Sequence, residues 1–481
     1  MGAARVSDVI VVGSGSGGGV VARRLVDAGA HVLLLEAGGR DENPAIHDPG
    51  RVHELWLSEV DWAYETVPQR HANGRRLAWP RGKVLGGSSC LNAMIWVRGA
   101  PADFDTWGDG WAWDDVLPVY ERLEAELGLL TTFEPDAIHR ALAEAAYECG
   151  IPPNANYNGE TQDGFSYMQY TIRDGVRHST AAAFVRPVEP SPNLELRTGA
   201  CAQRLLFDGT RCVGVEWAGG SAYADLVVVC GGTIGSAQLL LLSGIGPADH
   251  LRAVGVDVVA DLPGVGENLH DHLLSPVIFS AEREIGPPSP GLPACQTHLF
   301  WRSRPGLPGP DIQPIHFMVP MYEAWMEGPA NGFTLLGGIV RPLSRGTLRL
   351  TGPSAADPVA LDPNVLAREE DFESLLAAVE LCRRLGTADA LGDWGVTEQY
   401  PGSREVREYV RETAITYHHQ VGTCRLGTDA TAVVDSHLRV HGIDGLRVAD
   451  ASVMPSVTTG NTNAPSIMIG DRAAEFILAD A

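Results

Sequence analysis

A glycine-rich loop near the start of the chain, residues 13–19, constrains the fold more than any other stretch. The apolar, β-branched run at residues 8–12 predicts a buried strand before the loop, and residues 20–29 predict a helix that ends at a glycine. Residues 31–36 predict a second buried strand with an acidic residue at its carboxyl end. This order of strand, Gly-x-Gly-x-x-Gly, helix, strand and acid is typical of a βαβ unit that binds a dinucleotide.

Each part of this unit has an expected role. Gly13 makes the tight turn, Gly15 lets backbone N–H groups approach a pyrophosphate, and Gly18 lets the helix pack closely on the strand. The positive end of the helix then faces the phosphates, and Glu36 accepts hydrogen bonds from the ribose hydroxyls. In a chain rich in glycine the motif alone also fits a flexible turn. The flanking strands, helix and acid favour the dinucleotide interpretation.

Composition and charge narrow the kinds of partner. The chain has 481 residues, of which 44% are hydrophobic, so it is long enough for two or three globular domains. Its formal net charge of -24 repels phosphate backbones and anionic lipids, and we expect no nucleic-acid or membrane-surface partner. No apolar run reaches the length of a spanning helix, and the first apolar run is a strand rather than a signal peptide. We therefore expect no membrane insertion and a cytoplasmic location.

The 8 cysteines are scattered without a C-x-x-C pair. This spacing supports neither a metal cluster nor a disulfide framework, so we expect reduced thiols and no metal ion.

Elements like those of the N-terminus return twice along the chain. Short strands are expected between residues 194 and 230, and residues 236–243 predict a helix after a pair of glycines. Residues 446–450 and 465–478 predict a last strand and a last helix that begins with proline. Because the order of strand, glycine and helix is repeated, we expect these pieces to join the N-terminal unit in one discontinuous domain.

The stretch from about residue 272 to residue 429 differs in composition and in its pattern of predicted elements. Its first part is rich in proline, residues 315–319 and 333–341 predict strands, and residues 371–385 predict a helix. We expect an α/β fold (α+β overall) with a Rossmann-like, cofactor-binding domain and a second, β-sheet-rich substrate domain. The first would comprise residues 1–155, 192–270 and 430–481, and the second residues 156–191 and 271–429.

Two stretches near the C-terminus carry side chains suited to catalysis. In residues 417–427, a pair of histidines is followed by small, turn-forming residues. Such a position presents imidazole to a bound substrate, and the ordinary pKa of histidine suits a general base near neutral pH. In residues 460–470, Asn463 stands directly before a helix, where its amide either orients a substrate or caps the helix.

Several stretches, in order, resemble the glucose–methanol–choline (GMC) oxidoreductases, which are FAD-dependent enzymes that oxidise alcohols. The glycine loop with Glu36 is similar to the family's ADP-binding unit, and residues 82–92 resemble its first signature. Residues 232–246 resemble the second signature, although Ala237 stands where members usually carry proline or serine. Residues 310–313 are similar to a strand start in the choline dehydrogenase branch. The resemblance covers nearly the whole chain and implies that the discontinuous domain binds FAD.

The resemblance also implies roles for individual residues. His419, rather than His418, would be the general base, Asn463 its partner, and flavin N5 the hydride acceptor. Members that link FAD covalently do so through a histidine at the position of Leu91, so noncovalent FAD is expected. A photodecarboxylase branch carries cysteine at the position of His419, which argues against that activity. The expected cofactor-binding residues are Gly13, Gly15, Ser16, Gly18, Glu36, Ala37, Arg81, Gly86, Gly87, Ser89, Asn92, Ala93, Met94, Ala202, Asp450, Ala451, Asn463 and Ala464.

The sequence leaves other questions open. The expected substrate is a primary or activated small alcohol that becomes an aldehyde or ketone, and the expected electron acceptor is O2 or a quinone-like carrier. The oligomeric state and the roles of His316 and His418 are not determined. The alternatives are a hydroxynitrile lyase-like activity with FAD only structural, a flavin-binding module without turnover, and NAD in place of FAD.

Overall fold

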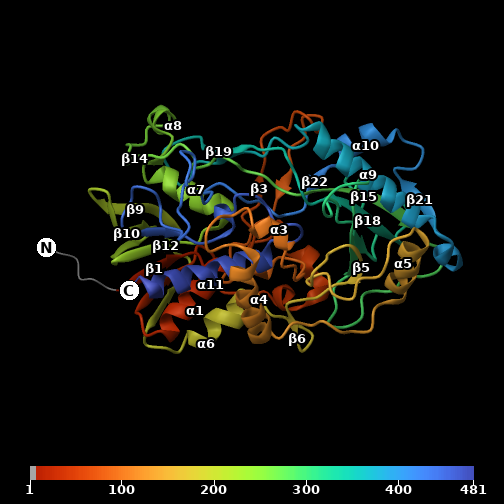
Figure 1. The fold of residues 1–481 in the computed structure, drawn as a ribbon, viewed down its shortest axis with the longest axis horizontal. Coiled ribbons are helices and arrows are strands. Elements are labelled where there is room, and N and C mark those ends of the chain that lie inside the picture. Colours follow the sequence, from red (N-terminus) through yellow and green to blue (C-terminus); the bar gives the residue numbers. More distant parts are fainter. Residues whose placement is uncertain (1–6, 481) are drawn as a thin grey trace.

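The computed structural model describes residues 7–480, and its two large β-sheets lie toward opposite ends of the long axis (Figure 1). The strand order of the first sheet is β23-β12-β1-β2-β8. In chain order its strands are β1 (Val9–Val12), β2 (Val32–Leu35), β8 (Leu194–Arg197), β12 (Leu226–Val229) and β23 (Leu446–Val448). The sheet is therefore assembled from three separated parts of the chain.

The first sheet is parallel, and its central strands are apolar along their whole length. β1 pairs with both β2 and β12, so that Val9 lies beside Val32 and Leu226, and every residue of β1 and β2 is buried. This is the pattern expected of a strand covered on both faces. A smaller antiparallel sheet comprises β9 (Ala202–Asp208), β10 (Arg211–Trp217) and β11 (Gly220–Tyr223).

Helix α1 (Ser16–Asp27) begins four residues before the helix predicted at residue 20. The sequence predicts a start too far along the chain because glycines disfavour a helix interior, and residues 17–19 are all glycine. Here they occupy the first turn because larger side chains have no room. A Cβ on Gly17 would lie 2.2 Å from the carbonyl oxygen of Ala449. α1 packs along α11 (Asn463–Ala479), and the two helices lie side by side in Figure 1.

The second sheet is antiparallel, in the order β21-β15-β18-β17-β16-β5 with β22 also paired to β15. Helix α9 (Glu369–Gly386) packs against β18 and β15 on one face of this sheet. Two of its strands and α9 match the elements predicted at residues 315–319, 333–341 and 371–385. The strands are β5 (Gly164–Tyr167), β15 (Leu273–Ser280), β16 (Cys295–Phe300), β17 (Ile315–Phe317), β18 (Gly332–Ile339), β21 (Thr397–Tyr400) and β22 (Ile415–Thr416).

The remaining longer helices are α4 (Trp113–Leu127), α5 (Ala137–Glu148), α7 (Gly232–Leu242) and α10 (Val406–Thr413). α7 starts four residues before its predicted start, again because a glycine stands in the first turn. No helix within residues 7–480 is long and apolar enough to cross a membrane. All strands of the second sheet fall within the predicted substrate domain, but the domain boundaries themselves stay a prediction.

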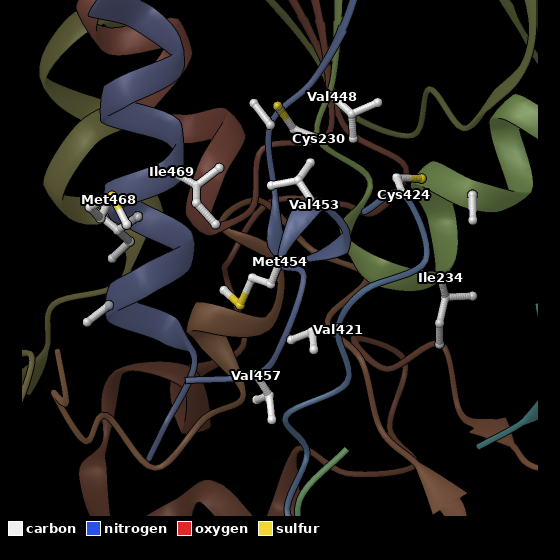
Figure 2. Close-up of a cluster of buried hydrophobic side chains, with 14 of the residues drawn as sticks. Cys230, Ile234, Val421, Cys424, Val448, Val453, Met454, Val457, Met468 and Ile469 are labelled. Carbon is white, nitrogen blue, oxygen red and sulfur yellow. The ribbon is translucent and has the colours of Figure 1, made fainter. Parts of the chain in front are cut away.

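A buried apolar cluster joins the C-terminal segments to the first sheet. Figure 2 shows the segments around Val421 and Val453 running between α11, which carries Met468 and Ile469, and α7, which carries Ile234. Because these segments are held from both sides, the polar residues that they carry have fixed positions. Those residues form much of the site described next.

Candidate active site

A large cavity is lined by residues of both sheets and by most of the predicted site residues. The glycine loop, the segment after Pro80, the residues between Cys230 and Gly235, and the C-terminal segments all line it. Thirteen of the expected cofactor residues border this space: Gly13, Gly15, Ser16, Glu36, Ala37, Arg81, Gly87, Asn92, Ala93, Ala202, Asp450, Ala451 and Asn463. His419 borders it too.

The glycine loop has the geometry that its sequence predicts. Gly13 has a φ of 99°, in the left-handed region that glycine adopts without strain. A Cβ on Gly18 would lie 1.9 Å from the carbonyl oxygen of Gly13, so this glycine permits the close packing of helix on loop. At Gly15 an added Cβ would meet nothing nearer than 3.9 Å, and this residue faces the cavity. The open face of Gly15 is therefore where a phosphate group has room to approach the backbone.

Glu36 lies at the carboxyl end of β2 and organises this loop. Its carboxylate accepts hydrogen bonds from the backbone N–H of Ser14 at 3.1 Å, from Ser14 Oγ at 2.6 Å and from the N–H of Gly38 at 2.8 Å. Burial raises the pKa of Glu36, and these hydrogen bonds oppose that rise. Glu36 therefore holds the loop as well as lining the cavity.

Asp450 plays the equivalent part for the second glycine-containing turn. Its carboxylate accepts hydrogen bonds from the backbone N–H of Gly232 at 2.9 Å, from Ser236 Oγ and from the N–H of Ser452 at 2.8 Å. The start of α7 is thereby tied to the segment that follows β23. The middle and last parts of the chain meet at this carboxylate.

Five predicted cofactor residues do not border the cavity: Gly18, Gly86, Ser89, Met94 and Ala464. They support the loops that do. The N–H of Gly86 donates a 3.0 Å hydrogen bond to Ser14 Oγ, and Ser89 Oγ donates a 2.6 Å hydrogen bond to the carbonyl of Gly86. Met94 and Ala464 are wholly buried beneath the surface of the cavity.

His419 is a buried histidine, 6% exposed, that lines the cavity. Its ring stacks on Tyr417 with centroids 4.6 Å apart, and its backbone N–H donates a 2.8 Å hydrogen bond to Asp271 Oδ1. Burial, with the nearby His272, His418 and Arg81, holds the pKa of His419 well below its ordinary value. The imidazole is therefore neutral near pH 7, as a base must be.

The side chain that contacts His419 is Asn461 and not Asn463. Asn461 Nδ2 lies 3.2 Å from His419 Nε2, and Asn461 Oδ1 accepts a 3.3 Å hydrogen bond from Gln313 Nε2. Asn463 instead accepts a 2.7 Å hydrogen bond from Ser16 Oγ. This corrects the predicted pairing. Because helix α11 begins at Asn463, that side chain is turned toward the glycine loop, while Asn461 lies in the loop before it.

His272 is a further residue of the site that sequence reasoning missed. Its Nδ1 lies 3.0 Å from Nδ1 of His419. Since Asn461 donates to Nε2 of His419, that nitrogen carries a lone pair, and the ring proton of His419 lies on Nδ1. That proton is donated to His272, which fixes the tautomer. The sequence signal is an Asp-His pair immediately before an apolar strand, next to the predicted domain boundary at residue 270.

Asp271 holds the loop that carries His419. Besides the N–H of His419, it accepts hydrogen bonds from Thr416 Oγ1 and, at 2.9 Å, from Gln420 Nε2. Burial raises the pKa of Asp271 to about 6, against the hydrogen bonds and the charge of Arg81. These bonds tie the segment from Thr416 to Gln420 to Asp271, two residues before β15.

His418 and His316, whose roles the sequence does not determine, have different surroundings. His418 has a φ of 67°, its ring lies 5.1 Å from Trp56, and its carbonyl accepts a 2.9 Å hydrogen bond from Arg81. His316 lies outside the cavity lining, stacked on Phe165 and bonded through Nδ1 to Thr297 Oγ1 at 2.9 Å. Of the two, His418 borders the site.

Comparisons with known proteins find similar proteins over nearly the whole chain. Family models described as GMC oxidoreductase match residues 7–274 and 342–470. An uncharacterized GMC-type oxidoreductase of Mycobacterium tuberculosis is 40% identical, covering 98% of this chain and 99% of the relative. The oxygen-dependent choline dehydrogenase of Brucella ovis is 36% identical, covering 98% of this chain and 95% of the relative. The crystal structure of pyridoxine 4-oxidase from Mesorbium loti superposes with a TM-score of 0.93 at 34% identity, covering 98% and 99% of the two chains.

The matches confirm the predicted fold class and the cofactor, FAD. The residues of the cavity fit that group. The open face of Gly15, the first turn of α1 and the carboxylate of Glu36 suit the diphosphate and ribose, and Leu91 beside them has no nucleophile for a covalent link. Among residues 7–480, no group of three or more His, Cys, Asp or Glu side chains is arranged to hold a metal ion.

Proposed function

The chain belongs to the GMC oxidoreductase family, and we propose that it oxidises a primary or activated small alcohol to an aldehyde or ketone with His419 as the general base. The family's members oxidise alcohols with FAD, and this chain is an FAD-dependent alcohol oxidoreductase. The observation that carries the proposal is the pair formed by the neutral His419 and Asn461 at the cavity wall.

The residues divide the work of alcohol oxidation between them. On binding, the alcohol hydroxyl replaces Asn461 as the donor to His419 Nε2, which then accepts the hydroxyl proton, while Asn461 Nδ2 donates a hydrogen bond to the alcohol oxygen. His272 keeps the proton of His419 on Nδ1, so that Nε2 stays available. FAD, when bound, supplies the acceptor for the hydride.

The backbone contributes to the site as well. The N-terminus of α11 borders the cavity at Asn463, and its positive end stabilises negative charge that develops nearby. We propose that FAD is held without a covalent bond, because the position used by covalent members is Leu91. Precipitating the holoprotein with acid should then release all of the flavin into the supernatant.

The electron acceptor belongs to the proposal and is either O2 or a quinone-like carrier. Relatives with names that specify oxygen, such as oxygen-dependent choline dehydrogenase and pyridoxine 4-oxidase, support O2. Admitting oxygen to alcohol-reduced protein tests this choice. Rapid return of the flavin colour with formation of peroxide supports O2, and persistent bleaching in air supports another acceptor.

The experiment that tests the central claim is anaerobic mixing of the holoprotein with a panel of alcohols, followed by flavin absorbance. We expect at least one alcohol to bleach the flavin, and His419→Ala to slow bleaching at least about 100-fold while FAD is retained. His31→Ala is the matched control, because the His31 side chain is 65% exposed and does not line the cavity. Unchanged bleaching in His419→Ala would remove the base assignment. Cleavage of a hydroxynitrile with no bleaching by any alcohol would favour the lyase alternative.

A further inference from the structure

One end of the cavity is bounded by an apolar face of the second sheet. Leu336 of β18 lies directly opposite Ile315 of β17 and Pro276 of β15, and cross-strand partners share a face. Leu274 is two residues from Pro276 and therefore projects to the same side. Leu274, Ile315 and Leu336 all line the cavity, while α9 covers the opposite face of the sheet. The sheet thus presents a continuous hydrocarbon wall to the site.

Other apolar side chains extend this wall around the base. Phe317, two residues along β17 from Ile315, faces the same way and lines the cavity, as do Met321 and Ile415. Ile95 borders it from the segment that follows Gly86 and Gly87. The ring of Tyr417 packs in this cluster and stacks on His419. The proton acceptor therefore lies at the edge of an apolar compartment.

Few charged groups line the cavity. Among the described residues, three charged side chains line it: Glu36, Asp450 and Arg81. The two carboxylates are occupied by the glycine-loop and α7 hydrogen bonds, and Arg81 bonds the carbonyl of His418. Asp271, the carboxylate closest in sequence to His272, does not line the cavity and bonds Thr416, His419 and Gln420. The apolar compartment therefore has no counter-ion for a bound cation.

We propose that the substrate is an uncharged alcohol with a hydrocarbon body, which fills this compartment, and that alcohols with a fixed cationic group are rejected. This inference rests on the proposed function and narrows it. Burying a cation without a counter-ion costs far more than aromatic side chains such as Phe317 and Trp56 recover. A hydrocarbon of the same shape instead gains from leaving water.

The test compares two alcohols of the same shape that differ in charge. Choline and 3,3-dimethylbutan-1-ol differ in one atom, since a quaternary nitrogen replaces a quaternary carbon. Each is mixed anaerobically with the holoenzyme, and the rate of flavin bleaching is measured over a range of concentrations. We expect the second-order rate constant to be at least about 100-fold higher for the neutral alcohol. An equal or faster reaction with choline would overturn the inference and leave the proposed function intact. Bleaching by no alcohol in the wider panel would remove both.

A chain-length series gives an independent readout that requires no variant. For straight-chain primary alcohols, the second-order rate constant should rise about fourfold for each added methylene over the first few carbons. A flat or falling series would contradict an apolar compartment even if choline were rejected.

Met321 offers a matched pair of variants. It is half-buried and lines the compartment, and its side chain is similar in length to those of Glu and Gln. Met321→Glu supplies a carboxylate that Met321→Gln lacks. We expect the ratio of choline to neutral-alcohol rate constants to be at least about tenfold higher in Met321→Glu than in Met321→Gln, with FAD content equal in both. Equal ratios in the two variants would mean that charge does not govern selection here.

Discussion

Ser16 Oγ donates a 2.7 Å hydrogen bond to Asn463 Oδ1, which ties the first residue of helix α1 to the first residue of helix α11. Both residues line the cavity beside the glycine loop. The contact places Asn463 beside the glycine loop and leaves Asn461 as the amide beside His419. The two asparagines should therefore differ in what their removal does.

Replacing Asn461 should impair chemistry without impairing cofactor retention. In Asn461→Ala we expect flavin reduction by alcohol to slow about 100-fold, the usual cost of losing one donor to a reacting oxygen, with FAD content unchanged. Asn463→Ala is the matched comparison and should lose FAD more readily while each remaining flavin is reduced within about threefold of the normal rate. Stopped-flow absorbance and flavin content measure the two effects. The reverse assignment would restore Asn463 as the partner of His419.

His272 should act through the tautomer of His419. His272→Ala removes the acceptor for the Nδ1 proton of His419 and should slow flavin reduction about 10- to 100-fold. His272→Asn places an amide oxygen near the position of the lost Nδ1 and should recover most of the rate. The pH profile of kcat/KM provides the second readout, because a purely structural role would lower the rate without moving the profile.

The low pKa of His419 determines where activity falls with pH. As the proposed base, His419 works only when neutral, and burial holds its pKa well below the ordinary value of 6.5. Acidification should therefore leave kcat/KM nearly constant from about pH 8 to about pH 6, with the loss of activity below that range. The measurement is kcat/KM against pH with a neutral alcohol. An acidic limb at or above 6.5 would mean that the base is not held in this environment.

Buried histidines outside the site should make stability depend on pH. Burial lowers the pKa of His139 to about 4, from 6.5 when unfolded. The unfolded chain then binds more protons below pH 6.5, so the free energy of unfolding should fall as pH decreases from about 6.5 toward about 4. Between pH 7.5 and 5.5 this one group should contribute a loss of about 1.4 kcal/mol.

The variant His139→Asn isolates this contribution, since an amide oxygen replaces the Nδ1 that bonds Thr297 Oγ1 at 2.8 Å. The difference in unfolding free energy between the two pH values, measured with denaturant on the holoprotein, should shrink by about 1.4 kcal/mol. An unchanged difference would show that His139 is not neutral in the folded protein at pH 5.5.

The open face of Gly15 should make that position sensitive to a single methyl group. Gly15→Ala meets no atom nearer than 3.9 Å, so the chain should fold, but the methyl group would occupy space next to the cavity. We expect FAD affinity to fall at least about tenfold, measured by flavin retention on dialysis. Gly39→Ala is the control, because an added Cβ there meets nothing within 4 Å and Gly39 does not line the cavity. Equal retention in both variants would contradict close phosphate approach at Gly15.

The elements that the sequence predicts well are those set by local pattern. Apolar runs predict β1, β2 and β12, and apolar residues at helical spacing predict α9. Burial of a strand or of one helix face requires such a pattern of apolar residues in the sequence. The start of α1 was predicted late, since the packing that requires glycine in its first turn comes from the distant Ala449. The helix propensity of the local sequence does not reflect that contact.

The arrangement within the site depended on contacts that local pattern does not encode. Asn461 and Asn463 stand two residues apart in similar surroundings, and only the start of α11 separates their directions. His272 meets His419 because Leu273 pairs with Thr416 across two strands, a register that neither segment reveals alone. The apolar wall likewise arises from pairing among β15, β17 and β18.

The order in which the strands of the first sheet occur along the chain has a consequence for biosynthesis. β12 lacks its outer neighbour until residues 446–448 have been made, and Asp450, Asn461 and helix α11 follow later still. A nascent polypeptide on the ribosome therefore holds the glycine loop long before it holds a closed cavity. Maturation to a coloured flavoprotein waits for the last helix, and a product truncated before it should remain colourless and inert.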